Sequence, residues 1–190
     1  GENVMKVRLG DVATYINGYA FKPEDWSDTG LPIIRIQDLT GNSYKTNRYN
    51  GEYDKKYEVN DGDILISWSA SIGVHVWQGE KAVLNQHIFK VEFNKQVNIC
   101  KNFYIYQVEN ILKKAISETH GATMKHLTKP IFDALPFYLP DIKAQNEISN
   151  VLDKITTIIS LRKKQIKKLD ELVKSRNVGE IVISKTEVAA

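Results

Sequence analysis

The chain has 190 residues, 42% of them hydrophobic and 26% charged, with a formal net charge of +3, which is the composition of an ordinary globular protein. It contains no apolar run of roughly 18 residues, the length that would predict a membrane-spanning helix. The single cysteine, Cys100, excludes an internal disulfide, and the N-terminus lacks the pattern of a signal peptide, so we expect a cytoplasmic protein that does not enter a membrane.

Basic residues are concentrated in the second half of the chain. Residues 1–94 carry 10 Lys and Arg against 13 Asp and Glu, whereas residues 95–129 carry 6 against 2 and residues 141–176 carry 9 against 5. This asymmetry suits a surface that faces phosphate groups, and it suits equally well the solvated face of a helix.

The first half of the chain predicts a mixed α/β domain. A helix is expected over residues 9–16, where the apolar residues have helical spacing and Asn17-Gly18 suits a helix end. Strands are expected at the β-branched or alternating runs 31–36, 64–68, 74–77 and 88–93. In the last of these, the aromatic side chains should share one face and Lys90 and Glu92 the other. These pieces indicate a twisted mixed sheet with long connections.

The second half predicts a helix over 102–117, followed by a short extended segment over 127–139. The buried stripe of the helix should consist of Tyr104, Val108, Ile111, Leu112 and Ala115. The character of the chain changes at Pro140, so we place the globular domain at residues 1–140.

A long helix is predicted over residues 141–176, which contain neither Gly nor Pro. Its apolar residues repeat in heptads, and the two core positions hold Ile148, Leu152, Ile155, Ile159, Arg162, Ile166, Leu169 and Val173. At ~1.5 Å per residue this helix would be about 54 Å long, more than a domain with a radius of gyration of ~14 Å can cover. Part of the stripe must therefore bind a partner. Arg162 either fixes the register of that pairing or extends into solvent. Residues 177–190 are expected to form a weakly ordered tail.

Catalytic and metal-binding motifs are missing from the sequence. We find no glycine-rich phosphate loop and no Gly-x-Ser-x-Gly elbow. The four histidines, His75, His87, His120 and His126, lack the cysteine partners and the spacing of a zinc site. We therefore assign no catalytic residue, no metal ligand and no cofactor to this chain, and the pattern favours binding over catalysis.

Polar and aromatic side chains cluster instead where predicted elements end. Amides, hydroxyls, lysines and histidines on loops are the groups that read base edges and hold phosphates in DNA. Each cluster taken alone also fits ordinary turn chemistry. The candidate DNA-binding residues are Tyr19, Lys22, Gln37, Ser67, Trp68, Ser69, Ser71, Asn85, Gln86, His87, His120, Thr123, Lys125 and His126.

The same segments, in order, carry a family pattern. It runs through Leu9-Gly10-Asp11-Val12, Asn17-Gly18-Tyr19-Ala20-Phe21, residues 30–36, residues 62–67, Gly73, Asn85-Gln86, residues 121–127, Leu139-Pro140, Gln145, Ile148 and residues 169–172. This ordered set resembles the target-recognition half of the specificity subunits of type I restriction–modification systems. The chain departs from the pattern at Ala70, where a glycine is usual, at Asp141, where a second proline is usual, and at Ala144, where a glutamate usually precedes the glutamine.

The resemblance implies a non-catalytic subunit that reads double-stranded DNA. A full subunit of this family carries two recognition domains and two long helices that pair as an antiparallel coiled coil, and each domain reads half of a split site. One such half could form a homodimer and read an interrupted palindrome. Methylation subunits, and restriction subunits where present, would be its partners and would bring S-adenosylmethionine and ATP. Phosphate contacts would come from Lys22 and Lys125.

Within this interpretation, direct readout of bases is assigned to one set of loop residues: Gln37, Ser69, Asn85, Gln86, Thr123 and His126. The alternatives are an adaptor that binds a methylation subunit through the long helix without reading DNA, a fragment of a longer subunit, and a free-standing nuclease or methyltransferase. The missing motifs argue against the last of these.

Overall fold

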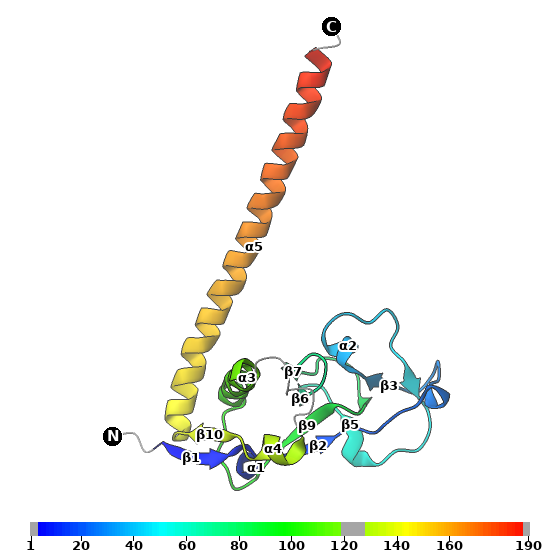
Figure 1. Cartoon of the computed structure of the whole chain (residues 1–190), viewed down its shortest axis with the longest axis vertical. Helices are drawn as coiled ribbons and strands as arrows, with labels where there is room; N and C mark the ends of the chain where they lie inside the picture. Colours follow the sequence, from blue (N-terminus) through cyan, green and yellow to red (C-terminus); the bar gives the residue numbers. More distant parts are fainter. Residues whose placement is uncertain (1–3, 119–127, 188–190) are drawn as a thin grey trace. The chain divides into compact units, whose positions relative to one another are not determined.

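The computed structural model of the protein describes residues 4–118 and 128–187. These residues divide into two units, one that ends at Asn146 and one that begins at Glu147. The strands are β1 (Met5–Arg8), β2 (Ala13–Asn17), β3 (Leu31–Ile34), β4 (Arg48–Tyr49), β5 (Glu58–Val59), β6 (Ile64–Ser67), β7 (Gly73–Val76), β8 (Ala82–Leu84), β9 (Ile88–Phe93) and β10 (Pro136–Leu139). The helices are α1 (Leu9–Val12), α2 (Ile36–Leu39), α3 (Lys101–Glu118), α4 (Lys129–Asp133) and α5 (Ile142–Glu187), with short 3-10 turns η1 (Pro23–Asp25) and η2 (Lys55–Tyr57). Figure 1 labels most of them. The predicted fold class, a mixed α/β domain followed by one long helix, is confirmed.

The described strands form three sheets rather than the single sheet that we expected. β1 pairs with β10, β2-β9-β6-β7 form an antiparallel sheet, and β4-β3-β8-β5 form a mixed sheet in which β3 and β8 are parallel. The physical reason lies in β6, which is buried along its whole length and has apolar residues on both faces. A sheet with two apolar faces needs a second layer to cover each of them.

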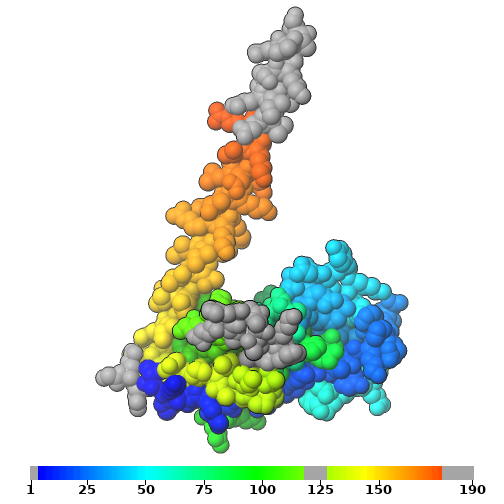
Figure 2. Space-filling model, in the orientation of Figure 1, coloured from blue at the N-terminus to red at the C-terminus, as the bar shows by residue number. Residues whose placement is uncertain are grey.

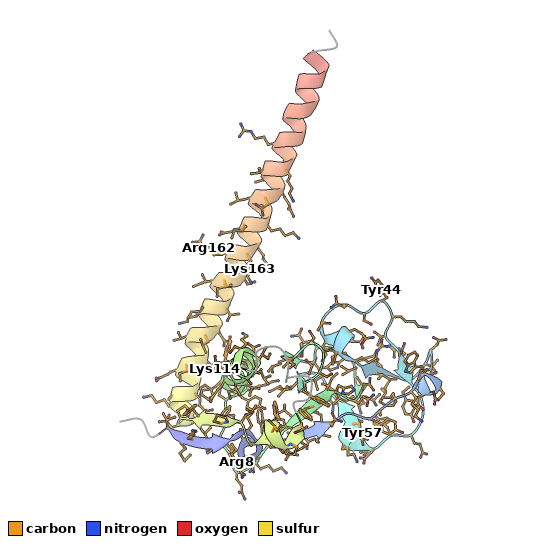
Figure 3. All side chains as sticks on the ribbon, viewed as in Figure 1. Arg8, Tyr44, Tyr57, Lys114, Arg162 and Lys163 are labelled. Atoms are coloured by element: carbon orange, nitrogen blue, oxygen red, sulfur yellow. The ribbon has the colours of Figure 1, made fainter. Side chains whose placement is uncertain are left out.

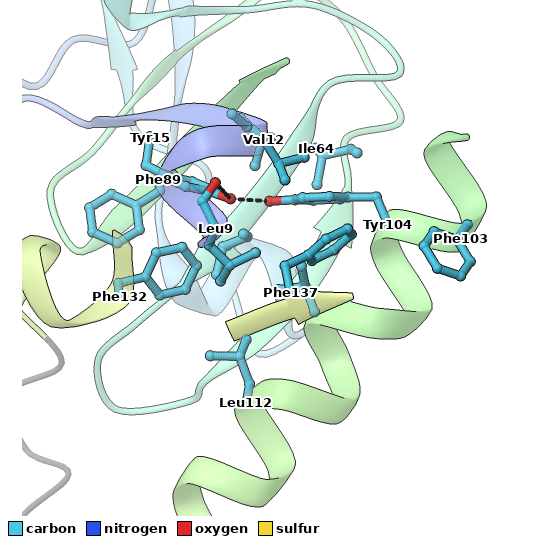
Figure 4. Packing of buried hydrophobic residues seen from close by; sticks show 14 of the residues in the cluster. Leu9, Val12, Tyr15, Ile64, Phe89, Phe103, Tyr104, Leu112, Phe132 and Phe137 are labelled. Atoms are coloured by element: carbon cyan, nitrogen blue, oxygen red, sulfur yellow. Dashed lines mark hydrogen bonds between the residues drawn. The ribbon is translucent and has the colours of Figure 1, made fainter. Parts of the chain in front are cut away.

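The core therefore has layers on both sides of the β2-β9-β6-β7 sheet. One face packs against α1, α3, α4 and β10 in a cluster that includes Tyr15, Phe89 and Phe132 (Figure 4). The other face packs against the mixed sheet through a smaller cluster that includes Leu65 and Ile88. In Figure 2 the yellow-green residues of α4 and β10 and the blue-to-cyan residues of the mixed sheet occupy different sides of the first unit.

A buried pair of tyrosines ties α3 to β2 within the larger cluster (Figure 4). The Tyr104 hydroxyl donates to the Tyr15 hydroxyl at 2.8 Å, and Tyr15 donates to the Leu9 carbonyl oxygen at 3.3 Å. Burial raises the pKa of both hydroxyls, which keeps them protonated as this chain of donors requires. The contact joins segments far apart in the sequence and so fixes α3 on the sheet.

The prediction of a helix over residues 9–16 is wrong. Only Leu9–Val12 is helical, and the chain continues as β2. Helical spacing over eight residues also fits a single turn followed by a strand, and the pairing of β2 with β9 along Ala13–Asn17 decides between the two. The extended segment expected over 127–139 likewise contains α4 before β10, with Pro130 in its first turn, where proline is tolerated.

Strand β9 has the predicted bounds, but its polar face is not exposed at Lys90, which is buried. The Lys90 ammonium group donates to the Glu58 carbonyl oxygen at 2.9 Å and lies 3.1 Å from the Glu92 carboxylate. A lysine on a strand that is covered on both faces needs hydrogen-bond partners within the protein, and β5 supplies a carbonyl acceptor. The predicted range of helix α3 is confirmed, and Tyr104, Val108 and Leu112 are buried.

The junction with α5 is held by a buried amide. The Gln145 side chain donates to the carbonyl oxygens of Pro140 at 2.9 Å and Asn98 at 3.1 Å, and it accepts from the Cys100 N–H at 2.8 Å. Gln145 is one of the residues that carried the family pattern, and these contacts explain why an amide suits this position: it needs two donors and an acceptor.

Helix α5 runs over 46 residues, about 69 Å at ~1.5 Å per residue. Its backbone remains helical to Glu187, beyond the end expected at residue 176. Large apolar side chains on it are exposed, among them Val151, Ile155, Ile159, Ile166, Leu169 and Val173. Arg162 and Lys163 project from different sides of the helix (Figure 3). Of the helices that the structure describes, none is long and apolar enough to cross a membrane.

Candidate nucleic-acid interface

The ends of three strands meet at one edge of the β2-β9-β6-β7 sheet. β9 runs antiparallel to both β2 and β6, so its first residues lie beside the last residues of these two strands. Asn17 pairs with Phe89, and Ser67 pairs with Ile88. The loops that follow β2 and β6 and the loop that precedes β9 therefore converge, and these loops carry most of the candidate DNA-binding residues.

Gly18 allows two of these loops to touch. Its backbone N–H donates to the Ile88 carbonyl oxygen at 3.1 Å, and a Cβ at this position would lie only 2.0 Å from the Asn85 carbonyl oxygen. Next to it, Tyr19 and Asn85 form an isolated parallel bridge. The sequence predicts a helix end at Asn17-Gly18, and this prediction is wrong. The glycine instead allows two backbone segments to approach each other closely.

Trp68 closes the same edge. Its indole N–H donates to Asn17 Oδ1 at 3.2 Å, and its backbone N–H donates to the His87 carbonyl oxygen at 3.2 Å. The Trp68 ring lies 4.9 Å from the His87 ring in an edge-on arrangement and stacks on Phe89, with 5.6 Å between ring centroids. Asn17 was not among the candidates from the sequence, although the Asn-Gly pair could have pointed to it.

The loop after β6 is held from inside by Ser67, which is fully buried. Its hydroxyl donates to the Ser71 carbonyl oxygen at 2.5 Å and lies 3.3 Å from His75 Nε2. Burial lowers the pKa of His75, which favours the neutral imidazole in this contact. In this arrangement Ser67 shapes the loop, while Ser71 is exposed and Ser69 is half-buried.

Ala70 adopts a left-handed backbone conformation in this loop, with φ of 55°. This is the position at which the family pattern has glycine. The left-handed conformation costs a residue with a Cβ ~1–2 kcal/mol of conformational free energy.

We expect Ala70→Gly to stabilise the protein by about 0.5–1 kcal/mol, because the relief of strain exceeds the ~0.4–1 kcal/mol of added flexibility in the unfolded chain. Urea unfolding of the two proteins measures the difference. Ala20→Gly is the matched control: Ala20 is exposed and is not among the described residues with positive φ, so it should destabilise instead. Equal effects of the two changes would contradict the argument.

The neighbouring mixed sheet brings a further loop to this edge. Because β3 and β8 are parallel, Arg35 after β3 and Asn85 after β8 lie at the same end of this sheet. The Asn85 N–H donates to the Ile34 carbonyl oxygen at 3.1 Å. Asn85 Oδ1 is buried and has no hydrogen-bond partner among the described residues. Gln37 follows in α2 with its side chain exposed.

The structure thus brings most of the candidates to one edge. Those at the edge are Tyr19, Ser67, Trp68, Ser69, Ser71, Asn85, Gln86 and His87. Lys22 lies further along the loop that follows β2, and Gln37 lies in α2; both are exposed. His120, Thr123, Lys125 and His126 fall outside the described residues. In the part of the chain that the structure describes, no cluster of His, Cys, Asp and Glu could hold a metal ion.

Comparison with known proteins decides the family. Residues 1–171 match the type I restriction modification DNA specificity domain. The chain belongs to this family, which is not catalytic. It is 26% identical over 173 residues to the type I restriction enzyme EcoBI specificity subunit of Escherichia coli, a match that covers 90% of this chain and 36% of that subunit. With the MjaVIII specificity subunit of Methanocaldococcus jannaschii the identity is 28%, over 88% of this chain and 39% of the relative.

The fold is shared as well. The crystal structure of the HsdS subunit from Thermoanaerobacter tengcongensis superposes with a TM-score of 0.63 at 19% identity, over 83% of this chain and 38% of that one. The chain spans about two fifths of the length of the relatives it matches. The resemblance drawn from the sequence is therefore confirmed, including its extent of one half-subunit.

Proposed function

We propose that this chain reads a DNA sequence as half of a type I specificity subunit and catalyses nothing itself. The observation that carries the proposal is the family match over residues 1–171. The convergence of Tyr19, Trp68, Gln86 and His87 at one sheet edge supports it, because amide, aromatic and imidazole groups can bond and stack at the edges of bases. Lys22 and Lys125 supply phosphate contacts in this proposal, and Gln37, Ser69, Asn85, Thr123 and His126 join Gln86 in reading bases.

We further propose that two copies pair through α5 as an antiparallel coiled coil. The support is the stripe of exposed apolar side chains on this helix. A stripe that stays exposed on a helix of this length is typical of a surface that a partner covers. An isologous pair presents two identical readers and so recognises an interrupted palindrome.

The partners follow from the same role. Methylation subunits would bind S-adenosylmethionine and flip the target adenine, and restriction subunits would use ATP, while this chain supplies only the sequence choice. It needs no cofactor of its own.

Mapping of methylated adenines tests the proposal. The chain is co-expressed with the methylation subunit of its own system in a host that lacks other adenine methylation, and modified positions are sequenced. An interrupted palindrome is expected. A non-palindromic split motif would replace the homodimer with a pair of different halves, and a stable complex without any methylated motif would favour the adaptor.

Lys22→Ala is expected to weaken binding to cognate and random duplexes by the same factor and to lower the slope of log K against log salt by about 0.9, the value for one phosphate contact. Fluorescence anisotropy at several salt concentrations measures both. Lys95→Ala is the matched control, because exposed Lys95 follows the end of β9 at the opposite end of the sheet. A loss restricted to the cognate duplex would assign Lys22 to base reading instead.

A further inference from the structure

A small aromatic pocket opens in the first unit, beside the sheet edge described above. Its volume is about 260 Å³. The residues that line it are Tyr19, Phe21, Tyr49, Glu52, Tyr53, Asp54, Lys56 and Tyr57. Five of the eight are aromatic, and Tyr19 is the one residue that the pocket shares with the candidate DNA-binding set.

The aromatic rings that line the pocket pack against one another. Phe21 is buried; its ring packs edge-on against Tyr19 at 5.0 Å between centroids and lies tilted against Tyr49 at 4.9 Å. Tyr57 lies 5.7 Å from Tyr19. Gly51 lets Tyr49 fold back over the chain, because a Cβ at residue 51 would lie 2.5 Å from the Tyr49 hydroxyl oxygen, which donates to the Glu52 carbonyl. The pocket is therefore a packed part of the fold.

The charge of the lining is negative. Lys56 is the one basic residue among those that line the pocket, and it is paired with Asp54 at 2.8 Å. Glu52 has no ion pair among the described residues and leaves one carboxylate uncompensated. The Lys56 ammonium group already lies 4.8 Å from the centroid of the Tyr57 ring, so this ring face attracts a cation within the protein itself.

We propose that this pocket binds an organic cation, an alkylammonium or guanidinium group. Aromatic faces carry negative potential and a carboxylate adds to it, so a cation gains from both while a DNA phosphate would be repelled. A volume below the ~300–1,000 Å³ of drug-sized sites suits a single headgroup. The source is either a Lys or Arg side chain of a protein partner or a free polyamine. This proposal does not depend on DNA recognition.

The test is a titration of the full chain with choline and with its neutral isostere 3,3-dimethylbutan-1-ol, followed by NMR at constant ionic strength. A cation–π contribution of ~1 kcal/mol predicts that choline binds about fivefold more tightly than the alcohol. Tyr57→Leu should remove that preference. Glu52→Gln should reduce it without altering the packed rings, which keeps the proposal testable if Tyr57→Leu disturbs the fold.

Tyr44→Leu is the matched control. Tyr44 is fully exposed, lies outside the pocket and projects from the loop before β4, whereas Tyr57 lies by β5 (Figure 3). This change should leave choline binding unaltered. Equal binding of choline and the alcohol would overturn the proposal, and so would preferential binding of adenosine, which would identify a base-stacking site. Separate titrations of the protein with blocked lysine and arginine esters and with spermidine then distinguish the two sources of the cation. The ligand that binds more tightly identifies the source.

Discussion

Changing Ile159 and Ile166 together to glutamine is expected to abolish self-association of the chain. Both side chains are about half exposed on α5, at 49% and 59%, and stand one heptad apart. Burying such a side chain contributes about 1.5–3 kcal/mol, and a pair of identical helices would lose the contribution of both residues from each copy. The sum, about 6 kcal/mol or more, weakens association by about four powers of ten. Light scattering over a range of protein concentrations measures the mass.

Thr157→Gln with Lys164→Gln is the control for this change. These exposed residues are also one heptad apart but belong to the opposite side of the helix, and glutamine is a good helix former at all four positions. The control should remain dimeric, with unchanged helix content in both proteins. A wild-type chain that is monomeric at every concentration would contradict homodimeric pairing and would require a different half as the natural partner.

Elements with a long, regular pattern could be predicted from the sequence. α3 and most of α5 follow from a sustained apolar period, and β9 follows from alternation. α5 continues past its predicted end because Gly179 costs a helix only ~1 kcal/mol and does not by itself stop it. The two short helical turns α1 and α2 are too brief to produce a periodic signal, so the apolar spacing over residues 9–16 does not separate α1 from β2.

The candidate interface could be predicted only as separate loops. Local chemistry identifies Tyr19, Trp68, Gln86 and His87, but their common position depends on which strands pair, and local sequence patterns do not reveal that pairing. Even the visible signal at Gly18 had two physical meanings, a left-handed helix end or a close backbone approach, and only the contact with Asn85 separates them. The aromatic pocket escaped prediction for the same reason: its rings come from residues 19–57 and meet through tertiary packing.

Gln86→Ala is expected to weaken binding to the cognate duplex by about 1–3 kcal/mol, roughly fivefold to 150-fold, while binding to random DNA stays the same. The backbone of Gln86 is fixed at the sheet edge, where its N–H donates to the Tyr19 carbonyl oxygen at 2.8 Å. A primary amide on a fixed backbone can bond bidentately to adenine, and the loss of such a pair affects only the sequence that offers it. Anisotropy at one fixed salt concentration, with the duplex defined by methylation mapping, measures the ratio.

Gln78→Ala is the matched control for this prediction. Gln78 is exposed and follows β7, whose last residue Val76 pairs with Ile64, at the end of the sheet opposite to Ser67 and Gly73. Removal of the same amide there should change neither affinity. Equal losses on cognate and random duplexes for Gln86→Ala would show that its side chain positions the loop or meets a phosphate. Base reading would then have to come from the other amides and hydroxyls at this edge, because only a change in the ratio of the two affinities reports a contact that distinguishes one base from another.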